Sequence, residues 1–315
     1  MDSRRLTILG ASGFVGRYIV RDLAREGAVI AACCRHASSA GFLRPMGDVG
    51  QIGTFSADLA DEQALAAVVA GADAVVNAVG ILYERGKQRF DLVHCQAPAR
   101  LAALAKSAGV KRFVHISALG ADAHSSSTYG RSKAEGEATV RAAFPGATIL
   151  QPALVFGPED TFFNRFAAMA RFAPGLPLIG GGATRFQPVY VGDVAAAVAV
   201  ALARDDTEGK TYELAGPAAF TLKQLFELIL HVIGRKRLLL RVPFGLASIE
   251  AFFLEWAPRP ILTRDQVRML RHDSVATPGA PGLADLGITP AALELILPSY
   301  LDRYRRPGSY RPSHA

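Results

Sequence analysis

Residues 6–16 read LTILGASGFVG, and this stretch decides the fold. An apolar run ends at Gly10, and apolar residues spaced for one helical face begin at Phe14, which predicts a strand, a turn and a helix. Gly10 permits the tight turn, Gly13 lets the backbone approach a pyrophosphate, and Gly16 lets helix and strand pack closely. Free N–H groups at the start of a helix attract phosphate, so the stretch predicts a dinucleotide-binding turn. Its expected contacts are Gly10, Ser12, Gly13, Phe14, Val15, Gly16 and Arg17.

The rest of the N-terminal half repeats the alternation of apolar strand and amphipathic helix. The expected strands are 6–9, 28–34, 51–56, 74–79, 112–117 and 148–151, and the expected helices are 14–26, 61–69, 90–108 and 129–143. Continuous apolar strands that alternate with helices form a parallel sheet covered on both faces. The sequence therefore predicts an α/β fold with a doubly wound, Rossmann-type parallel sheet.

The regular pattern loosens after about residue 155, and prolines and glycines gather at 174–182. Further helices are expected at 192–203, 221–233 and 244–256. We expect an NADP-binding domain over 1–160 that is rejoined by 185–215, and a smaller, mostly helical lobe over 161–315 that faces a substrate, a partner or a membrane. The basic segment 303–315 is expected to be a flexible tail.

The end of the second strand indicates which dinucleotide binds. Folds that prefer NAD carry an acidic residue there for the ribose 2′-hydroxyl, whereas this strand ends in Cys34 and Arg35. A guanidinium at this position suits the 2′-phosphate of NADP, with Arg17 as a second contact, so NADPH is the expected cofactor. The alternative is that Arg35 is a solvated charge at the end of a strand.

Residues after the later strands supply further expected cofactor contacts. Asp58 can accept a hydrogen bond from the adenine amino group, although a helix cap uses the same residue type. The small residues after the fourth strand leave space for the cofactor ribose. The further contacts are Asp58, Leu59, Ala78, Val79, Gly80, Pro152 and Val155.

Three residues form a candidate site for hydride chemistry. Ser117 ends the fifth strand, and Tyr129 and Lys133 lie four apart on one face of the next helix. A lysine cation lowers the pKa of a nearby phenol, and a serine hydroxyl can polarise a carbonyl group, so the set suits proton transfer. We also expect all three to contact the cofactor, since Lys133 can hold the hydroxyls of the nicotinamide ribose. The sequence leaves open whether a substrate is turned over.

Composition and charge exclude several other classes of protein. The net charge is +7, but no nucleic-acid-binding module accompanies it, so nucleic acid is not an expected partner. No apolar run reaches the roughly 18 residues of a transmembrane helix. Cys33, Cys34 and Cys95 form no metal-ligand pattern and are expected to be buried thiols in a reducing, cytoplasmic setting. The first strand begins close to Met1, which we take to leave no room for a signal or transit peptide.

These residues resemble the short-chain dehydrogenase/reductase superfamily, in its extended or atypical branch, over about residues 4–235. The resemblance rests on the glycine turn, Ser117 and the pair Tyr129 and Lys133, in that order, and on residues 187–194, QPVYVGDV. It implies a seven-stranded parallel sheet.

A closer resemblance covers nearly the whole chain. Residues 43–51, 125–129, 261–267 and 282–288 are similar to the family of NADPH-binding accessory subunits of respiratory complex I, of the alpha-subcomplex subunit 9 type. That family implies tightly held, structural NADPH beside the peripheral arm of complex I, near the membrane. Without an organelle-targeting extension, the resemblance suggests a bacterial relative at the cytoplasmic face of the inner membrane.

Two further readings stay open. The complete set of Ser117, Tyr129 and Lys133 also fits a freestanding NADP(H)-dependent reductase or epimerase that acts on a quinone- or isoprenoid-like molecule. The C-terminal third sets Arg235, Lys236 and Arg237 before a stretch rich in leucine and aromatic residues, and Arg259, Arg264, Arg268 and Arg271 follow. This pattern suits an anionic membrane surface, although ordinary core helices with solvated arginines would look the same.

Overall fold

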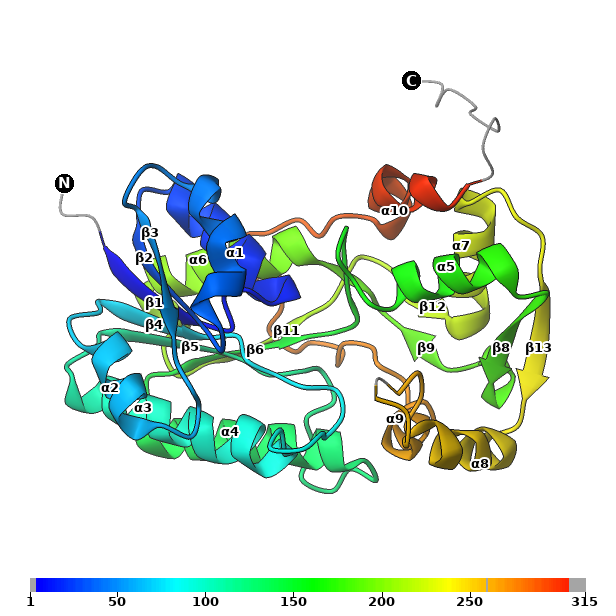
Figure 1. Ribbon diagram of the computed structural model, residues 1–315, viewed down its shortest axis with the longest axis horizontal. Coiled ribbons are helices and arrows are strands. Elements are labelled where there is room, and N and C mark those ends of the chain that lie inside the picture. The colour runs from blue at the N-terminus through cyan, green and yellow to red at the C-terminus, as the bar shows by residue number, and fades with distance from the viewer. Residues whose placement is uncertain (1–3, 259, 306–315) are drawn as a thin grey trace. The chain divides into compact units, whose positions relative to one another are not determined.

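The computed structural model describes residues 4–258 and 260–305, and the chain forms two compact units (Figure 1). The first unit contains the described residues up to Pro152, together with Val191–Leu214 and Ala276–Thr289. The second contains Ala153–Tyr190, Ala215–Val275 and the described residues from Pro290 onward. Arg259 and most of the expected tail, 306–315, lie outside the described residues.

The first unit is built on one seven-stranded sheet. Its strands are β1 (Arg5–Leu9), β2 (Val29–Cys34), β3 (Ile52–Ser56), β4 (Ala74–Asn77), β5 (Arg112–Ile116), β6 (Thr148–Pro152) and β11 (Thr211–Leu214). They lie in the order β3-β2-β1-β4-β5-β6-β11, and every neighbouring pair is parallel. The predicted doubly wound parallel sheet and its seven strands are confirmed. The strand order reverses between β1 and β4, which is where such sheets bind ligands.

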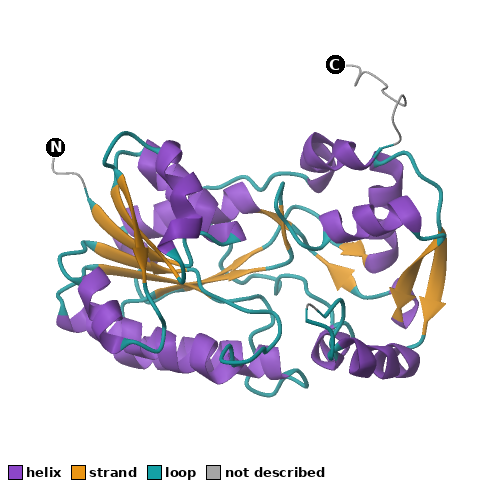
Figure 2. Ribbon diagram, viewed as in Figure 1, coloured by secondary structure: helices purple, strands orange, loops and turns teal. Residues whose placement is uncertain are grey.

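Helices cover both faces of this sheet (Figure 2). One face carries α1 (Phe14–Arg25) and α6 (Val191–Ala203), which pack on each other. The other carries α2 (Glu62–Val69), α3 (Ala97–Ser107) and α4 (Thr128–Ala143) (Figure 1). Short 3₁₀ segments are η1 (Ala37–Met46) and η4 (Asp205–Thr207). Apart from β11 and the 3₁₀ segments, for which no bounds were predicted, these strands and helices agree with the predicted ones to within a few residues, because each carries its own apolar period.

The predicted helix over 90–108 has a different start. Its first part is the π-helix η2 (Asp91–Gln96), and the regular helix α3 begins only at Ala97. Pro98 lacks an N–H group, so it cannot donate to the carbonyl group of His94 as the fourth residue along an α-helix would. A widened turn accommodates this gap, and such turns often occur at functional sites.

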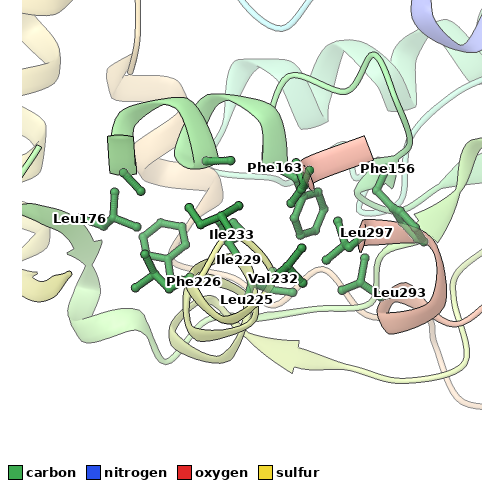
Figure 3. Packing of buried hydrophobic residues seen from close by; sticks show 14 of the residues in the cluster. Phe156, Phe163, Leu176, Leu225, Phe226, Ile229, Val232, Ile233, Leu293 and Leu297 are labelled. Carbon is green, nitrogen blue, oxygen red and sulfur yellow. The ribbon is translucent and has the colours of Figure 1, made fainter. Parts of the chain in front are cut away.

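The second unit has an aromatic-rich core. Three helices surround it: α5 (Phe163–Phe172), α7 (Leu222–Val232) and α10 (Leu293–Leu301), the last followed by η5 (Asp302–Tyr304). Figure 3 shows Phe156, Phe163 and Phe226 packed among the leucine and isoleucine side chains of these helices. The buried carboxylate of Asp160 accepts a 2.6 Å hydrogen bond from the hydroxyl of Tyr300, which ties α10 to the loop before α5.

Shorter elements complete the second unit. They are β7 (Val155–Phe156), β8 (Gly175–Ile179), η3 (Gly180–Gly182), β9 (Arg185–Phe186), β10 (Val189–Tyr190), β12 (Phe220–Thr221), β13 (Leu238–Val242), α8 (Phe244–Leu254) and α9 (Arg264–Met269). β8 pairs in parallel with β13, and α8 packs on α9. Among the described residues, no helix is both long enough and apolar enough to cross a bilayer.

Candidate cofactor site

The glycine turn after β1 has the tight geometry that the sequence predicted. Gly10 has a φ of +77°, a region that favours glycine, and its N–H donates to the carbonyl of Cys33 at 3.0 Å. A methyl group at Gly10 would lie 2.8 Å from the backbone of Ala78, and one at Gly16 would lie 2.1 Å from the carbonyl oxygen of Gly10. The turns after β1 and β4 therefore touch at the point where the strand order reverses.

The start of α1 is suited to a phosphate group. Gly13 is its N-cap residue, no side chain caps it, and its first turn holds no acidic residue. The first backbone N–H groups of a helix lack partners within the helix and carry partial positive charge. These observations fit the pyrophosphate of a dinucleotide, because a cradle lined by glycine backbone admits the ligand where a side chain would fill the space.

Two arginines flank this turn. The guanidinium of Arg17 donates to the carbonyls of Gly13 at 3.3 Å and Ser12 at 3.2 Å, and it lies 4.9 Å from the ring of Phe42. Arg17 therefore braces the glycine turn from within the protein. Arg35 is exposed and directly follows the last residue of β2. Its expected contact with a 2′-phosphate stays a prediction.

The residues after β3 resolve one alternative. Asp61, and not Asp58, is the N-cap of α2, where its carboxylate accepts from the N–H of Ala64. The helix-cap reading of Asp58 is therefore wrong. The exposed carboxylate of Asp58 accepts from the N–H of Ala60 at 3.0 Å, and the carbonyl of the next residue, Leu59, accepts from Arg100 at 3.2 Å. An adenine contact at Asp58 stays a prediction.

The turn after β4 lies close to the α4 side chains. Asn77 is buried, and its side-chain oxygen accepts from the N–H of Val79 at 3.2 Å. A methyl group at Gly80 would lie 3.5 Å from Nζ of Lys133 and 3.9 Å from Nε2 of His94. The absence of a side chain at Gly80 thus leaves the lysine amine open to this turn, where the ribose was expected.

Ser117 and Lys133 are both buried at the end of β5. The hydroxyl of Ser117 donates to a carboxylate oxygen of Glu137 at 2.5 Å, and Nζ of Lys133 donates to the carbonyl of Ile116 at 3.3 Å. Burial lowers the pKa of Lys133 to about 8, and the carboxylate of Glu137 opposes that shift. The structure brings these two predicted residues together, with an acidic residue that the sequence analysis did not single out.

Tyr129 is half-buried in the first turn of α4, where the side chain of Ser127 caps the helix. Its ring meets the rings of Phe90 and His94 edge to face, with centroids 5.9 and 5.5 Å apart. Burial raises the pKa of Tyr129 to about 12. The prediction that Lys133 lowers the pKa of this phenol is therefore wrong, because burial disfavours the charged phenolate.

His94 is a site residue that sequence reasoning missed. Its Nε2 accepts from the N–H of Ile81 at 3.1 Å, and its Nδ1 lies 2.9 Å from the hydroxyl of Ser132. The ring stacks on Phe90 at 5.2 Å. Burial, together with the charge of Lys133, lowers the pKa of His94 to about 3. A neutral His94 on the π-helix therefore fixes the turn after β4 beside Tyr129.

Other polar residues of the site also had no recognised signal. Gln151 donates to Glu137 at 2.7 Å, and Nδ1 of His115 lies 3.1 Å from the side-chain nitrogen of Asn77. His115 is buried on β5, and burial holds its pKa well below the usual range. For Glu137, in contrast, a signal was available: the four-residue spacing from Tyr129 through Lys133 and Glu137 to Arg141 places all four on one helical face.

Pro152 and Val155 are the remaining predicted contacts of the cofactor. Pro152 ends β6 in the first unit, and its carbonyl accepts from the N–H of Leu119 at 2.9 Å. Val155 belongs to β7 in the second unit. The three cysteines are buried thiols, and burial raises the pKa of both Cys33 and Cys95 to about 12. Among the described residues, no group of histidine, cysteine or acidic side chains could hold a metal ion.

Comparison with known proteins relates the chain to one family. The model of the NAD dependent epimerase/dehydratase family matches residues 6–215. The solved structure of Citrobacter sp. triphenylmethane reductase superposes with a TM-score of 0.77 at 20% identity, over 94% of this chain and 99% of that one. This structural likeness supports the fold.

Two curated relatives carry different names. The chain is 37% identical over 314 residues to NADH dehydrogenase (ubiquinone) 1 alpha subcomplex subunit 9, mitochondrial, of Arabidopsis thaliana, and the match covers 96% of this chain and 78% of that protein. It is 33% identical over 255 residues to ceramide reductase of Caulobacter vibrioides, over 80% of this chain and 78% of that protein.

Proposed function

The chain belongs to the NAD dependent epimerase/dehydratase family and, within it, to the family of the alpha subcomplex subunit 9 proteins; from this premise we propose that it is an NADPH-binding accessory subunit of respiratory complex I. The observation that carries the proposal is the similarity to these subunits along nearly the whole chain, both units included. Since the family is described as NAD dependent, the cofactor is a nicotinamide dinucleotide.

NADPH in particular is favoured by the residues around the turn. The N–H groups at the start of α1 would hold the pyrophosphate, Arg35 would pair with the 2′-phosphate, and Lys133 would hold the nicotinamide ribose. When bound, the nicotinamide can supply a hydride. A structural role for the cofactor is supported by Ser117, whose hydroxyl proton is held by Glu137 and is not directed at a substrate carbonyl.

The same proposal includes contact with an anionic membrane surface, at the cytoplasmic face of the inner membrane of a bacterium. Helix α8 directs its small residues inward and its large ones outward: Ala247 and Ala251 are fully buried, whereas Phe253 is 68% and the nearby Trp256 is 82% exposed. Residues 235–272 contain eight lysines and arginines against three acidic residues. Exposed aromatic residues beside excess positive charge suit the interface of an anionic bilayer.

Isolation of native complex I from the source organism tests the subunit assignment. We expect this chain to remain with the intact complex through two different separation methods, with NADPH still bound. The recovery of intact complex I without the chain, in cells that express it, would contradict the assignment.

A second candidate function is an NADPH-dependent reductase. It is favoured by the ceramide reductase relative and by the presence of Tyr129 beside Phe90 and His94, since a phenol carries a proton at neutral pH that can be given to a carbonyl oxygen. The substrate would then be a ceramide-like lipid, or a quinone- or isoprenoid-like molecule. NADPH consumption with such lipids, lost in Tyr129→Phe, would establish this function, and its absence with every candidate would remove it.

A further inference from the structure

A buried carboxylate joins the strand ends to the helix that carries the predicted catalytic pair. Glu137 is only 5% exposed, and its carboxylate accepts three hydrogen bonds: from Ser117 at 2.5 Å, from Gln151 at 2.7 Å and from Arg141 at 3.2 Å. Ser117 directly follows β5, Gln151 belongs to β6, and Arg141 also donates to Thr211 of β11 at 2.6 Å. Glu137 therefore links α4 to three neighbouring strands.

Glu137 is also the acidic neighbour of Lys133. The two residues are four apart on α4, so their side chains lie on the same face. Other titratable or charged groups lie near the lysine: His94 and Cys95 on η2 and His115 on β5. Tyr129 and Arg141 follow the same helical spacing on α4, and the carboxylates of Glu135 and Asp91 act on Cys95. Burial keeps both histidines, the thiol and the phenol uncharged at neutral pH. Glu137 forms an ion pair with Arg141 at 3.2 Å, and its charge also opposes the lowering of the Lys133 pKa by burial.

The amine of Lys133 faces the cofactor side of the cluster. Its Nζ is held by the carbonyl of Ile116 and lies next to Gly80, in the turn where the ribose is expected. A protonated amine donates to ribose hydroxyls as a cation, and a neutral amine binds them more weakly. The charge on Lys133 therefore matters for holding the ribose.

We propose that Glu137 is a positioning residue of the cofactor site: its carboxylate holds the Ser117 hydroxyl within the protein, and its charge favours the protonated form of Lys133, which is the form that binds the ribose. This inference rests on the proposed binding of a nicotinamide dinucleotide. The pKa of Lys133 is lowered to about 8 by burial, and loss of the Glu137 charge would lower it further. Without the Glu137 charge, Lys133 should lose its proton at a lower pH than in the unaltered protein. The loss of cofactor affinity that occurs as pH rises should therefore begin at a lower pH.

Titration of NADPH affinity against pH tests the proposal. In the unaltered protein we expect affinity to fall as pH rises through about 8. In Glu137→Gln this bend should move down by about one pH unit or more, because an opposite charge that favoured the protonated amine is removed. Glu26→Gln, at an exposed position just after α1, is the control and should leave the bend in place. Glu137→Asp keeps the charge, so its bend should lie close to that of the unaltered protein.

The outcomes separate this inference from the proposed function. No binding of NADPH or NADH to the unaltered protein at any pH would defeat the proposed cofactor role itself. Binding with the same bend in Glu137→Gln as in the unaltered protein would show that Glu137 has only a structural role. If Glu137→Gln does not fold, the Cε signal of Lys133 in labelled, unaltered protein gives the answer by NMR: a lysine that is already neutral at pH 7 overturns the proposal.

Discussion

The hydroxyl of Ser117 donates a 2.5 Å hydrogen bond to the carboxylate of Glu137, and both side chains are buried. The proton that would polarise a substrate carbonyl is thus already engaged. Ser117→Ala should therefore destabilise the fold by about 1–3 kcal/mol, because a buried carboxylate loses a donor. We expect NADPH affinity to change little. Chemical unfolding and NADPH titration measure the two effects, with exposed Ser38→Ala as the control. Loss of affinity with unchanged stability would instead make Ser117 a direct contact of the cofactor.

Gly10 is a position where the turn does not tolerate a side chain. Gly10→Ala combines a φ of +77° with a contact of 2.8 Å to the backbone of Ala78. We expect a loss of about 1–3 kcal/mol in the free energy of unfolding and a loss of nucleotide binding. Gly41→Ala is the matched control, because a methyl group there meets nothing within 4 Å. An equal free energy of unfolding for the two variants, measured in denaturant, would contradict the claim that Gly10 cannot accept a side chain.

Arg35 is expected to distinguish the two dinucleotides. Arg35→Ala removes a cation that pairs with the 2′-phosphate, so NADPH affinity should fall by about ten- to a hundredfold, while NADH affinity stays the same. Isothermal titration with both nucleotides measures the difference. Arg25→Ala, at the exposed end of α1, should change neither affinity. An equal loss for NADPH and NADH would assign Arg35 a general role in place of phosphate recognition.

His94 should make the fold sensitive to acid. Its pKa is about 3 in the folded protein against 6.5 for an ordinary histidine, so only the unfolded chain takes up this proton as pH falls below 6.5. Stability is therefore lost on acidification, by about 2 kcal/mol between pH 7 and 5 from this residue. In His94→Gln, the decrease in the free energy of unfolding between pH 7 and 5 should be smaller by that amount. His231→Gln, at an exposed position, is the control and should give the same dependence of stability on pH as the unaltered protein. If His94→Gln also gave that same dependence, the account of His94 as a buried, neutral histidine would be refuted.

The outer face of α8 should control membrane binding. Phe253→Ser combined with Trp256→Ser removes two exposed aromatic side chains, so binding to vesicles that contain phosphatidylglycerol should weaken at least about tenfold. Cosedimentation measures this effect. Leu295→Ser is the control, since Leu295 is 78% exposed on α10 and belongs to a different surface element. Unchanged vesicle binding in the double variant would leave a protein partner as the occupant of this face.

Much of the first unit could be predicted from sequence because its signals are local. β1, β2 and β4 are short, mostly apolar runs, and the glycine turn follows β1 directly. The apolar pattern of such a segment indicates its secondary structure locally, without knowledge of the residues it contacts in the fold. The family could also be predicted, since long strings distributed along the chain matched it, and the comparisons confirm that membership.

The features that were missed depend on tertiary contacts. Glu137 looks like an ordinary acidic residue of a helix surface until β5 and β6 place Ser117 and Gln151 against it. The lowered pKa expected for Tyr129 failed for a related reason, since burial is a property of the fold and cannot be read from a four-residue spacing. β8 lies within a stretch rich in proline and glycine and is defined by its pairing with β13.

The identity of the tightly bound nucleotide tests the central claim most directly. The protein would be purified from its own cells without added nucleotide, unfolded, and the released ligand identified and quantified by mass spectrometry. Our account predicts NADPH or NADP⁺ in amounts stoichiometric with the chain, and a ligand-bound structure with the 2′-phosphate beside Arg35. Release of NAD(H) alone would contradict the assigned phosphate site, and a glycine turn that binds neither nucleotide even when both are supplied would contradict the account as a whole.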